Sequence, residues 1–359
     1  MKRDSFLTWM AAAASFPGRT ERYRPPPPPE ALEQDVTNVK AFGARGDGAN
    51  DDTQPIQRAI DASGAGKPVL FPVGRYRVRQ PIQLHTDTVL LGYGRHSILW
   101  CTEPGCDVLV CRKVHPVFLE GIALDGDATN RDGIVLDSAS DVRVRRCWIK
   151  SMGRRGITVG DTPCAIVDST VEMCGEDGIF VTETNSGDPA HVVACYIFAN
   201  GGNGLRFTRN GNQAMIMGCE IVNNAGCGIR IDTASNMISI VGNAIMGSGA
   251  DGVEISENSC YTGVVSNAIS GNKRSGVSIR ANANGTSLTA NRFVDNCRGG
   301  AADVAELVVW ESAETVVLGN VFARTAVPAA QAAAIRTDRA LGTSAVANVF
   351  HGLATPTSL

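Results

Sequence analysis

Gly228-Ile-Arg-Ile-Asp232 is followed 24 residues later by Gly252-Val-Glu-Ile-Ser256. Glycine followed by alternating aliphatic residues occurs at intervals of 22 to 26 residues, at Gly133, Gly156, Gly178, Gly204, Gly228, Gly252 and Gly276. Alternation with a period of two predicts short strands that each turn one aliphatic face towards a shared core. The pattern therefore predicts a stack of similar repeats rather than a globular arrangement of unlike elements.

A second series of residues keeps the same spacing as the glycines. It places a small polar residue or cysteine two positions before an apolar one, at Cys147, Ser169, Cys195, Cys219, Asn243, Asn267, Asn291, Asn320 and Asn348. About 24 residues is too short for a strand-helix-strand unit and fits one turn of short strands joined by bends. We predict an all-β fold, a parallel β-helix of about ten turns spaced by about 4.8 Å, in which Asn243, Asn267 and Asn291 form a ladder.

The N-terminal segment differs in composition from the repeats. Lys2-Arg3 precedes an apolar run from Phe6 to Ala14, which is the layout of an export signal over residues 1–15. Pro25 to Pro29 predict a stiff linker over 16–34. A disordered tail is the alternative for the first segment. We expect residues 35–359 to form one β-helix domain of a periplasmic or extracellular protein without a membrane span.

Composition narrows the classes of partner and cofactor. A net charge of −3 gives no basic surface for nucleic acid. The 11 cysteines are odd in number, and Cys147, Cys195 and Cys219 lie on the repeat grid, so buried thiols are expected rather than disulfides. The cysteine and histidine spacings match no metal-ligand pattern, so no metal site is predicted, and calcium is only left open as a cofactor.

The stretch before the repeats carries an independent signal. It reads Val39-Lys-Ala-Phe-Gly-Ala-Arg-Gly-Asp-Gly-Ala-Asn-Asp-Asp-Thr-Gln-Pro-Ile-Gln-Arg-Ala-Ile-Asp61, then Gly66-Lys-Pro-Val-Leu-Phe-Pro-Val-Gly-Arg-Tyr-Arg-Val78. It resembles the N-terminal signature of the pectate lyase superfamily, the right-handed parallel β-helix group that contains pectin-degrading enzymes, alginate epimerases and phage tailspikes. With the repeats, the resemblance covers about Val39 to Phe350.

The same stretch predicts a helix that closes the N-terminal end of the β-helix. Asp52 or Thr53 can cap it, and Ile56, Ala59 and Ile60 form one apolar face. A covered end protects the strand edges and the apolar interior of the first turn. The carboxylates of Asp47, Asp51 and Asp52 are accordingly interpreted as turn and cap groups, with a calcium site as the alternative.

The resemblance selects no reaction, because the catalytic motifs of its families are not matched. The alginate epimerase strand Tyr-Gly-Phe-Asp-Pro-His aligns with Arg155-Gly-Ile-Thr-Val-Gly160, which lacks the titratable groups at Thr158 and Gly160. The Gly-His-Gly and Arg-Ile-Lys triplets of polygalacturonases do not occur, and Lys150 replaces the calcium-binding aspartate of pectate lyases. Function has to be inferred from the site itself.

Two rows of outward side chains are expected on the strands that follow the repeat glycines. The first row reads Val135, Thr158, Phe180, Arg206, Arg230, Glu254 and Ser278, and the second reads Asp137, Gly160, Thr182, Thr208, Asp232, Ser256 and Arg280. The resemblance implies that a saccharide groove lies along such a sheet.

These rows supply the candidate site residues. Asp232 and Glu254 are expected about 8 Å apart, within the roughly 6.5 to 9.5 Å of inverting glycosidases. The alternative is that Arg230 simply pairs with both in a surface charge ladder. Guanidinium groups match uronate carboxylates, and an aromatic ring can stack on a sugar. Substrate binding is assigned to Arg155, Phe180, Arg206, Arg209 and Arg230.

A longer repeat adds further candidates. The interval from Gly178 to Gly204 carries extra residues near 185–189, where a loop can form one wall of the groove. Glu183 and Asp161 join the catalytic candidates, and Asp188 and His191 lie nearby, with a solvated turn as the alternative. Asp125, Asp127 and Asp132 are expected in a turn or, alternatively, around a cation.

The sequence therefore supports two functions. The first is an exported lyase or glycoside hydrolase that acts on an acidic or plant-type polysaccharide. The second is a non-catalytic β-helix that binds surface glycans, as adhesins and tailspike-like modules do. Enzymatic activity is left open between them, and a monomer is expected rather than a trimer.

Overall fold

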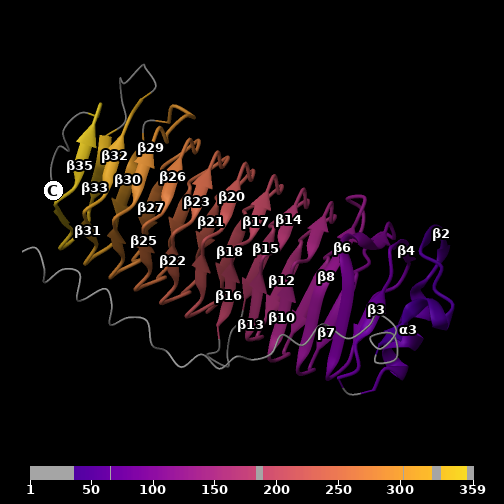
Figure 1. Ribbon diagram of the computed structural model, residues 1–359. Helices are drawn as coiled ribbons and strands as arrows, with labels where there is room; N and C mark the ends of the chain where they lie inside the picture. Colours follow the sequence, from indigo (N-terminus) through magenta and orange to yellow (C-terminus); the bar gives the residue numbers. More distant parts are fainter. Residues whose placement is uncertain (1–35, 65, 183–188, 302, 326–332, 354–359) are drawn as a thin grey trace, which may run out of the picture. The chain divides into compact units, whose positions relative to one another are not determined.

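The computed structural model describes residues 36–64, 66–182, 189–301, 303–325 and 333–353. Strands from successive turns pair in parallel and stack in three rows, one strand of each row per turn (Figure 1). The predicted all-β parallel β-helix is confirmed, with about 12 turns instead of about ten. Contacts divide the chain into Met1–Asp35 and Val36–Leu359. The export signal and the linker lie outside the described residues and stay predictions.

The first two rows form a 24-stranded sheet, because β6 and β8 are long enough to contribute to both rows. The first row contains β1 (Thr37–Asn38), β3 (Val69–Phe71), β6 (Thr88–Cys101), β8 (Val117–Asp125), β10 (Val142–Arg145), β13 (Cys164–Val167), β16 (Ala190–Val193), β19 (Met215–Met217), β22 (Ser239–Val241), β25 (Gly263–Val265), β28 (Ser287–Thr289), β31 (Val316–Leu318) and β34 (Ser344–Val346). The second row adds β2 (Asp47–Asp51), β4 (Gly74–Val78), β11 (Trp148–Lys150), β14 (Thr170–Glu172), β17 (Tyr196–Phe198), β20 (Glu220–Val222), β23 (Ala244–Met246), β26 (Ala268–Ser270), β29 (Arg292–Val294), β32 (Val321–Ala323) and β35 (Val349–His351).

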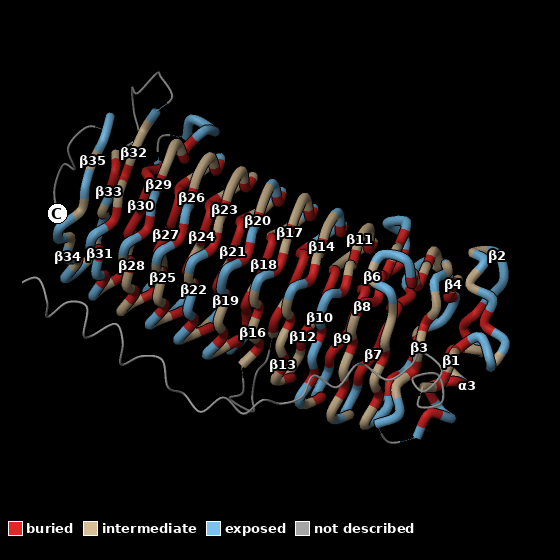
Figure 2. Tube along the Cα trace, viewed as in Figure 1, coloured by how far each residue is buried: buried red, intermediate tan, exposed pale blue. Residues whose placement is uncertain are grey.

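The third row is a separate sheet of 11 strands. It contains β5 (Ile82–Leu84), β7 (Leu109–Arg112), β9 (Ile134–Asp137), β12 (Ile157–Gly160), β15 (Ile179–Thr182), β18 (Leu205–Thr208), β21 (Ile229–Ile231), β24 (Val253–Ile255), β27 (Val277–Arg280), β30 (Ala305–Trp310) and β33 (Ala333–Asp338). Along these strands buried and more exposed residues alternate, and the buried ones face the interior (Figure 2). The outer side of this sheet is called the third-row face below.

The repeat glycines stand where the chain enters the third row, and space there is too small for a side chain. A Cβ at Gly228 would lie 2.5 Å from Ile245 Cγ2 and 2.7 Å from the carbonyl oxygen of Gly252. The next turn therefore packs directly on the glycine backbone, which explains why glycine recurs at this position.

The predicted asparagine ladder is present at a bend between the first two rows. Asn243 Nδ2 donates to Asn267 Oδ1 at 3.0 Å, and Asn267 Nδ2 donates to Asn291 Oδ1 at 3.0 Å. Each Oδ1 also accepts a backbone N–H of the preceding turn, as Asn267 Oδ1 does from Asn243 N at 2.9 Å. The ladder continues through Asn320 and Asn348. It satisfies buried backbone groups that the bend leaves without a strand partner.

Cysteines occupy the same bend in earlier turns. Cys195 Sγ and Cys219 Sγ each donate to backbone carbonyl oxygens, and Cys219 N donates to Asn243 Oδ1 at 2.8 Å. Among the described residues all 11 cysteines are free thiols, ten of them buried. The expectation of buried thiols agrees with this arrangement.

The N-terminal helix α3 (Thr53–Ala62) buries Ile56, Ala59 and Ile60 and lies next to the short 3-10 helix η2 (Val39–Phe42) and the first strands. The side chain that caps α3 is that of Asp51, and not that of Asp52 or Thr53 as predicted. Asp51 Oδ1 accepts from Thr53 N at 3.0 Å, whereas Asp52 makes no side-chain capping hydrogen bond. Asp52 instead accepts from two backbone N–H groups of the preceding turn, as turn chemistry requires. No helix within the described residues is long and apolar enough to cross a membrane.

We predict that Asn267→Ala lowers the free energy of unfolding by about 2 to 3 kcal/mol, because it leaves the buried backbone N–H of Asn243 without its acceptor and removes one of the two donors to Asn291 Oδ1. Urea denaturation followed by circular dichroism measures the change. Ser239→Ala, an exposed substitution on β22, is the control and is expected to change stability by less than about 0.5 kcal/mol. Equal midpoints for the two variants would contradict a stabilising ladder.

Candidate functional site

The third-row face presents its first row of outward residues in the predicted register. Strand pairing places Phe180 beside Arg206, Arg206 beside Arg230, and Arg230 beside Glu254. Thr158 lies beside Phe180 on the preceding turn. An aromatic ring, two guanidinium groups and a carboxylate therefore follow one another along four consecutive turns.

Asp232 does not lie in the groove as the sequence suggested. It directly follows β21, is only 1% exposed, and accepts from Arg230 Nε at 2.8 Å and from Arg206 Nε at 3.2 Å. Burial opposes its ionisation, but a hydrogen bond from Thr208 and the two guanidinium groups outweigh this and lower its pKa. Asp232 is therefore an ionised carboxylate held beneath the arginines.

Arg230 connects the two carboxylates that the sequence proposed as a catalytic pair. Its Nη2 lies 3.7 Å from Glu254 Oε1, while its Nε contacts Asp232. The arrangement is the charge ladder that was the alternative prediction. Glu254 keeps 19% of its side chain exposed, so of the two carboxylates it is the one that reaches the surface.

Phe180 is flanked by two of the predicted substrate-binding arginines. The Arg155 guanidinium carbon lies 3.6 Å from the ring centroid, and that of Arg206 lies 6.0 Å away. Arg155 Nε also pairs with Glu176 at 3.3 Å, and burial lowers the pKa of Arg155. These contacts hold the ring and the cations together and leave less of the Phe180 ring free to stack on a sugar.

The remaining candidates that the structure describes lie in bends or in another row of strands, not among the outward residues of these strands. Asp161 and Arg209 lie in the bends after β12 and β18, and Arg209 is exposed. His191 lies on β16 in the first row, away from the third-row face, and burial lowers its pKa. Glu183 and Asp188 lie outside the described residues, so their placement stays a prediction.

The aspartates expected around a turn or a cation each have separate partners. Asp125 pairs with Arg75 and Lys150, and Asp127 accepts from Thr129. Asp132 is buried, where Arg154 binds it through two hydrogen bonds of 2.8 and 2.7 Å. This arrangement favours the turn interpretation over a shared cation.

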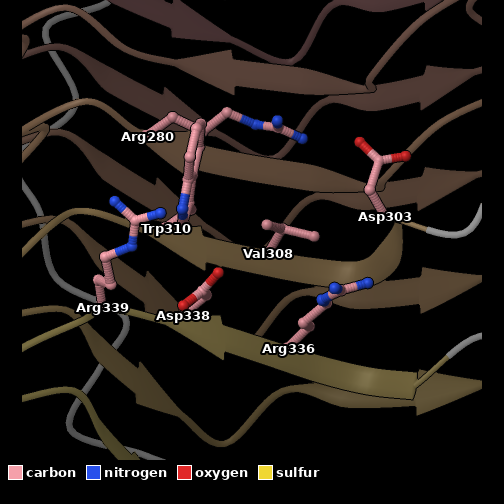
Figure 3. A pocket seen from close by; sticks show the side chains of 7 residues that line it. All are labelled: Arg280, Asp303, Val308, Trp310, Arg336, Asp338 and Arg339. Atoms are coloured by element: carbon pink, nitrogen blue, oxygen red, sulfur yellow. The ribbon is translucent and has the colours of Figure 1, made fainter.

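Further along the third-row face the two outward rows line a pocket of about 240 Å³ (Figure 3). On this face, Ser278, Val308 and Arg336 continue the first row of outward residues. Strand pairing places Arg280, Trp310 and Asp338 side by side in the second row of outward residues. The groove residues therefore extend towards the C-terminal turns, beyond the residues that the sequence identified.

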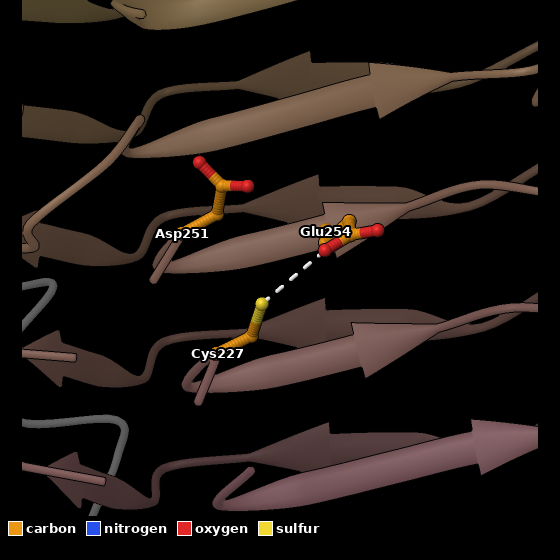
Figure 4. Close-up of side chains that lie close together, drawn as sticks. All are labelled: Cys227, Asp251 and Glu254. Carbon is orange, nitrogen blue, oxygen red and sulfur yellow. Dashed lines mark hydrogen bonds between the residues drawn. The ribbon is translucent and has the colours of Figure 1, made fainter. Parts of the chain in front are cut away.

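A cluster that the sequence did not identify lies beside Glu254. The ligand-type atoms of Cys227, Asp251 and Glu254 all lie within 4.8 Å of one another (Figure 4). Cys227 Sγ donates to Glu254 Oε2 at 3.4 Å. Burial, assisted by repulsion from Glu254, raises the pKa of Asp251 to about 6, although Ser275 N donates to it and Arg280 and Arg274 lie close.

The sequence contained a signal for this cluster. The residue immediately before each repeat glycine forms a row of its own, at Asp132, Arg155, Asp177, Asn203, Cys227, Asp251 and Ser275. In this row Cys227 N donates to Asn203 Oδ1 at 2.9 Å, and Asn203 N donates to Asp177 Oδ1 at 2.7 Å. These positions stack in the same way as the outward rows.

The cluster fits a shared proton better than a calcium ion. Calcium takes six to eight oxygen ligands, whereas the cluster offers two carboxylates and a thiol, close to the positive charges of Arg230, Arg274 and Arg280. The raised pKa of Asp251 lets that carboxyl group hold a proton close to neutral pH, beside the carboxyl group of Glu254. The arrangement can therefore take up or release a proton next to the positively charged side chains of Arg230, Arg274 and Arg280.

Comparison with known proteins supports the fold. Residues 36–102 match the family model described as "Rhamnogalacturonase A/epimerase, pectate lyase-like", and residues 160–322 match "Right handed beta helix region". The A-module of the mannuronan C-5 epimerase AlgE4 from Azotobacter vinelandii superposes with a TM-score of 0.74, at 22% identity, over 90% of this chain and 97% of that one. The resemblance to the pectate lyase superfamily and the right-handed β-helix fold are confirmed.

Curated relatives match over shorter stretches. The pre-neck appendage protein of Bacillus phage phi29 is 30% identical over 130 residues, 33% of this chain and 15% of that protein. The capsule KN3-specific depolymerase 1 of Klebsiella phage KN3-1 is 26% identical over 192 residues, 44% of this chain and 24% of that protein. The chain thus spans less than a quarter of the length of these two relatives, one of which is described as a capsule-specific depolymerase.

We predict that Asp251→Asn stabilises the protein increasingly as the pH rises. The raised pKa means that the stability from the protonated Asp251 is fully present below about pH 4 and is lost as the pH rises through about 6. The variant escapes this loss, so its free energy of unfolding should gain up to about 3 kcal/mol relative to wild type between pH 4 and 7. Urea denaturation at several pH values measures the difference.

The control is Asp303→Asn, because pairing with Arg274 lowers the pKa of Asp303. This exposed substitution should show no gain at pH 7. A pH-independent difference between Asp251→Asn and wild type would contradict a raised pKa at Asp251.

Proposed function

We propose that this chain binds an acidic polysaccharide along the third-row face and cleaves it there by proton transfer at Glu254. The observation that carries the proposal is the placement of Glu254 between two kinds of neighbour. On one side lie the guanidinium groups of Arg230 and Arg206, and on the other lies the proton-holding carboxyl group of Asp251.

The arginines supply the substrate class. Arg206 and Arg230 keep 35% and 32% of their side chains exposed while Asp232 holds them from beneath. Both guanidinium groups share the buried carboxylate of Asp232, and Glu254 lies beside Arg230, so the charges balance while part of each guanidinium group stays exposed to a ligand. A guanidinium group binds a carboxylate through two parallel hydrogen bonds, so uronate residues of a polysaccharide fit this position.

Glu254 and Asp251 supply the chemistry. In hydrolysis a carboxylic acid protonates the glycosidic oxygen as the bond to the sugar breaks, and water supplies the other half of the reaction. In β-elimination a base removes the proton next to the uronate carboxylate, and a neighbouring cation stabilises the negative charge that develops. Glu254 has the exposure for either role, and Asp251, buried against it, can take up or return the proton.

A non-catalytic glycan-binding module is the second candidate, and the burial of Asp232 favours it. The two carboxylates proposed as a catalytic pair are joined by Arg230, and Asp232 is ionised and inaccessible. A face whose charges mainly pair with each other can bind a polyanion without transferring a proton. Export and a monomeric state accompany either function as proposals, and the pattern over residues 1–15 supports export.

The reaction is tested by incubating the full chain with pectins, alginates and bacterial exopolysaccharides, with and without calcium. Absorbance of unsaturated uronates and the formation of reducing ends are followed together. A rise in both indicates β-elimination, and reducing ends alone indicate hydrolysis. Binding without either product would support the second candidate.

We predict that Glu254→Gln lowers the turnover rate on the cleaved polymer by at least about 100-fold, because amide nitrogen and oxygen cannot exchange a proton in this role. Binding of the polymer should stay within about threefold of wild type, because the arginines remain. Glu220→Gln, an exposed substitution on β20 of the second row, is the matched control and should leave turnover unchanged. Wild-type turnover in Glu254→Gln would remove Glu254 from the mechanism.

A further inference from the structure

The pocket at the C-terminal turns of the third-row face combines cations with an apolar floor. It is lined by Arg280, Asp303, Val308, Trp310, Arg336, Asp338 and Arg339. Three arginines against two aspartates give the lining a net charge of +1 (3 − 2). Two partners from outside the lining, Arg274 on Asp303 and Glu311 on Arg339, cancel each other and leave this count unchanged.

Arg280 is held in place but keeps a free donor. Its Nε donates to Ser278 Oγ, which fixes the direction of the guanidinium group. Its Nη2 is buried and finds no hydrogen-bond partner among the described residues. A buried donor without a partner costs free energy, which a bound acceptor would recover. Arg280 therefore favours an anionic or strongly polar ligand in the pocket.

Trp310 provides the apolar wall of the same pocket. Its ring lies between Arg280 and Arg339, and the Arg339 guanidinium carbon is 5.8 Å from the ring centroid (Figure 3). Arg339 is itself paired with Glu311. Val308 completes the floor beside the ring. An aromatic ring next to directed cations is a surface on which a ring-shaped, negatively charged ligand can stack and be oriented.

We infer that this pocket is a separate subsite for one acidic sugar residue, whose carboxylate pairs with Arg280 and Arg336 and whose ring lies against Trp310. The inference rests on the proposed function, because one polysaccharide chain would run along the third-row face past both Glu254 and this pocket. β30 lies two turns beyond β24, so the subsite is about 10 Å from Glu254 along the stack. It would bind a different residue of the chain from the one that reacts at Glu254.

The subsite is tested by binding rather than by cleavage. Hexamers of galacturonate and of mannuronate are titrated calorimetrically into full-length Glu254→Gln protein, with a neutral maltohexaose as the comparison. Arg280→Ala and Arg336→Ala are introduced singly into this background. Each should weaken binding of at least one acidic hexamer about tenfold, because each removes a charge-assisted hydrogen bond, and neither should change binding of the neutral hexamer.

Arg292→Ala is the matched control, since it removes an exposed arginine from β29 on the second row. Arg336 is exposed, so its variant tests the subsite even where Arg280→Ala alters folding, which melting temperatures reveal. Wild-type affinity in both pocket variants, equal losses with Arg292→Ala, or no binding of either acidic hexamer would overturn the subsite.

These experiments distinguish an error in the proposed function from an error in the proposed subsite. Absence of cleavage by the wild-type chain, with affinity still lost in the pocket variants, would leave a glycan-binding subsite without a reaction. Cleavage that depends on Glu254, with no effect of Arg280 or Arg336 on affinity, would leave the reaction and remove the subsite.

Discussion

Parallel hydrogen bonding between successive turns is the constraint on which the rest of this structure depends. Each strand donates to and accepts from the equivalent strand one turn away, so residues at equivalent positions must lie one above another. The interior obeys this rule in its stacked aromatic rings, where Phe293, Phe322 and Phe350 follow one another at 4.7 and 5.4 Å between centroids. The buried asparagines obey it too, and convert a bend into a continuous column of hydrogen bonds.

The same rule creates an electrostatic problem on the outer face. Arg206 and Arg230 are forced to be neighbours across a strand pair, and like charges at that spacing repel each other. Asp232 resolves the repulsion from beneath by accepting from both guanidinium groups. Its role is therefore to hold two cations at the surface, which accounts for its burial and its lowered pKa better than a role as an acid or a base.

The sequence predicted the strand register and the asparagine ladder, and it missed the placement of Asp232 and Asp251 at other bends. The glycine spacing was sufficient to pair Arg206 with Arg230 and Arg230 with Glu254, because hydrogen bonding leaves the strands no freedom of register. The spacing did not predict that Asp232, which follows the last residue of its strand, would turn inward and be buried. Asp251 was missed because the residues immediately before the repeat glycines were not considered as a row of their own, although they stack from turn to turn. Side-chain direction and burial at bends depend on tertiary packing that no period encodes.

The position of Arg280 connects the two parts of the proposed groove. Its positive charge acts on Asp251 and lowers the proton affinity of that carboxyl group, while its guanidinium group also lines the pocket beside Trp310. A uronate bound to Arg280 would neutralise that charge, so the pKa of Asp251 would rise further above 6. Because such coupling is reciprocal, protonation of Asp251 would in turn favour binding of the uronate. Occupation of the subsite would then keep Asp251 protonated at higher pH, next to the exposed carboxyl group of Glu254.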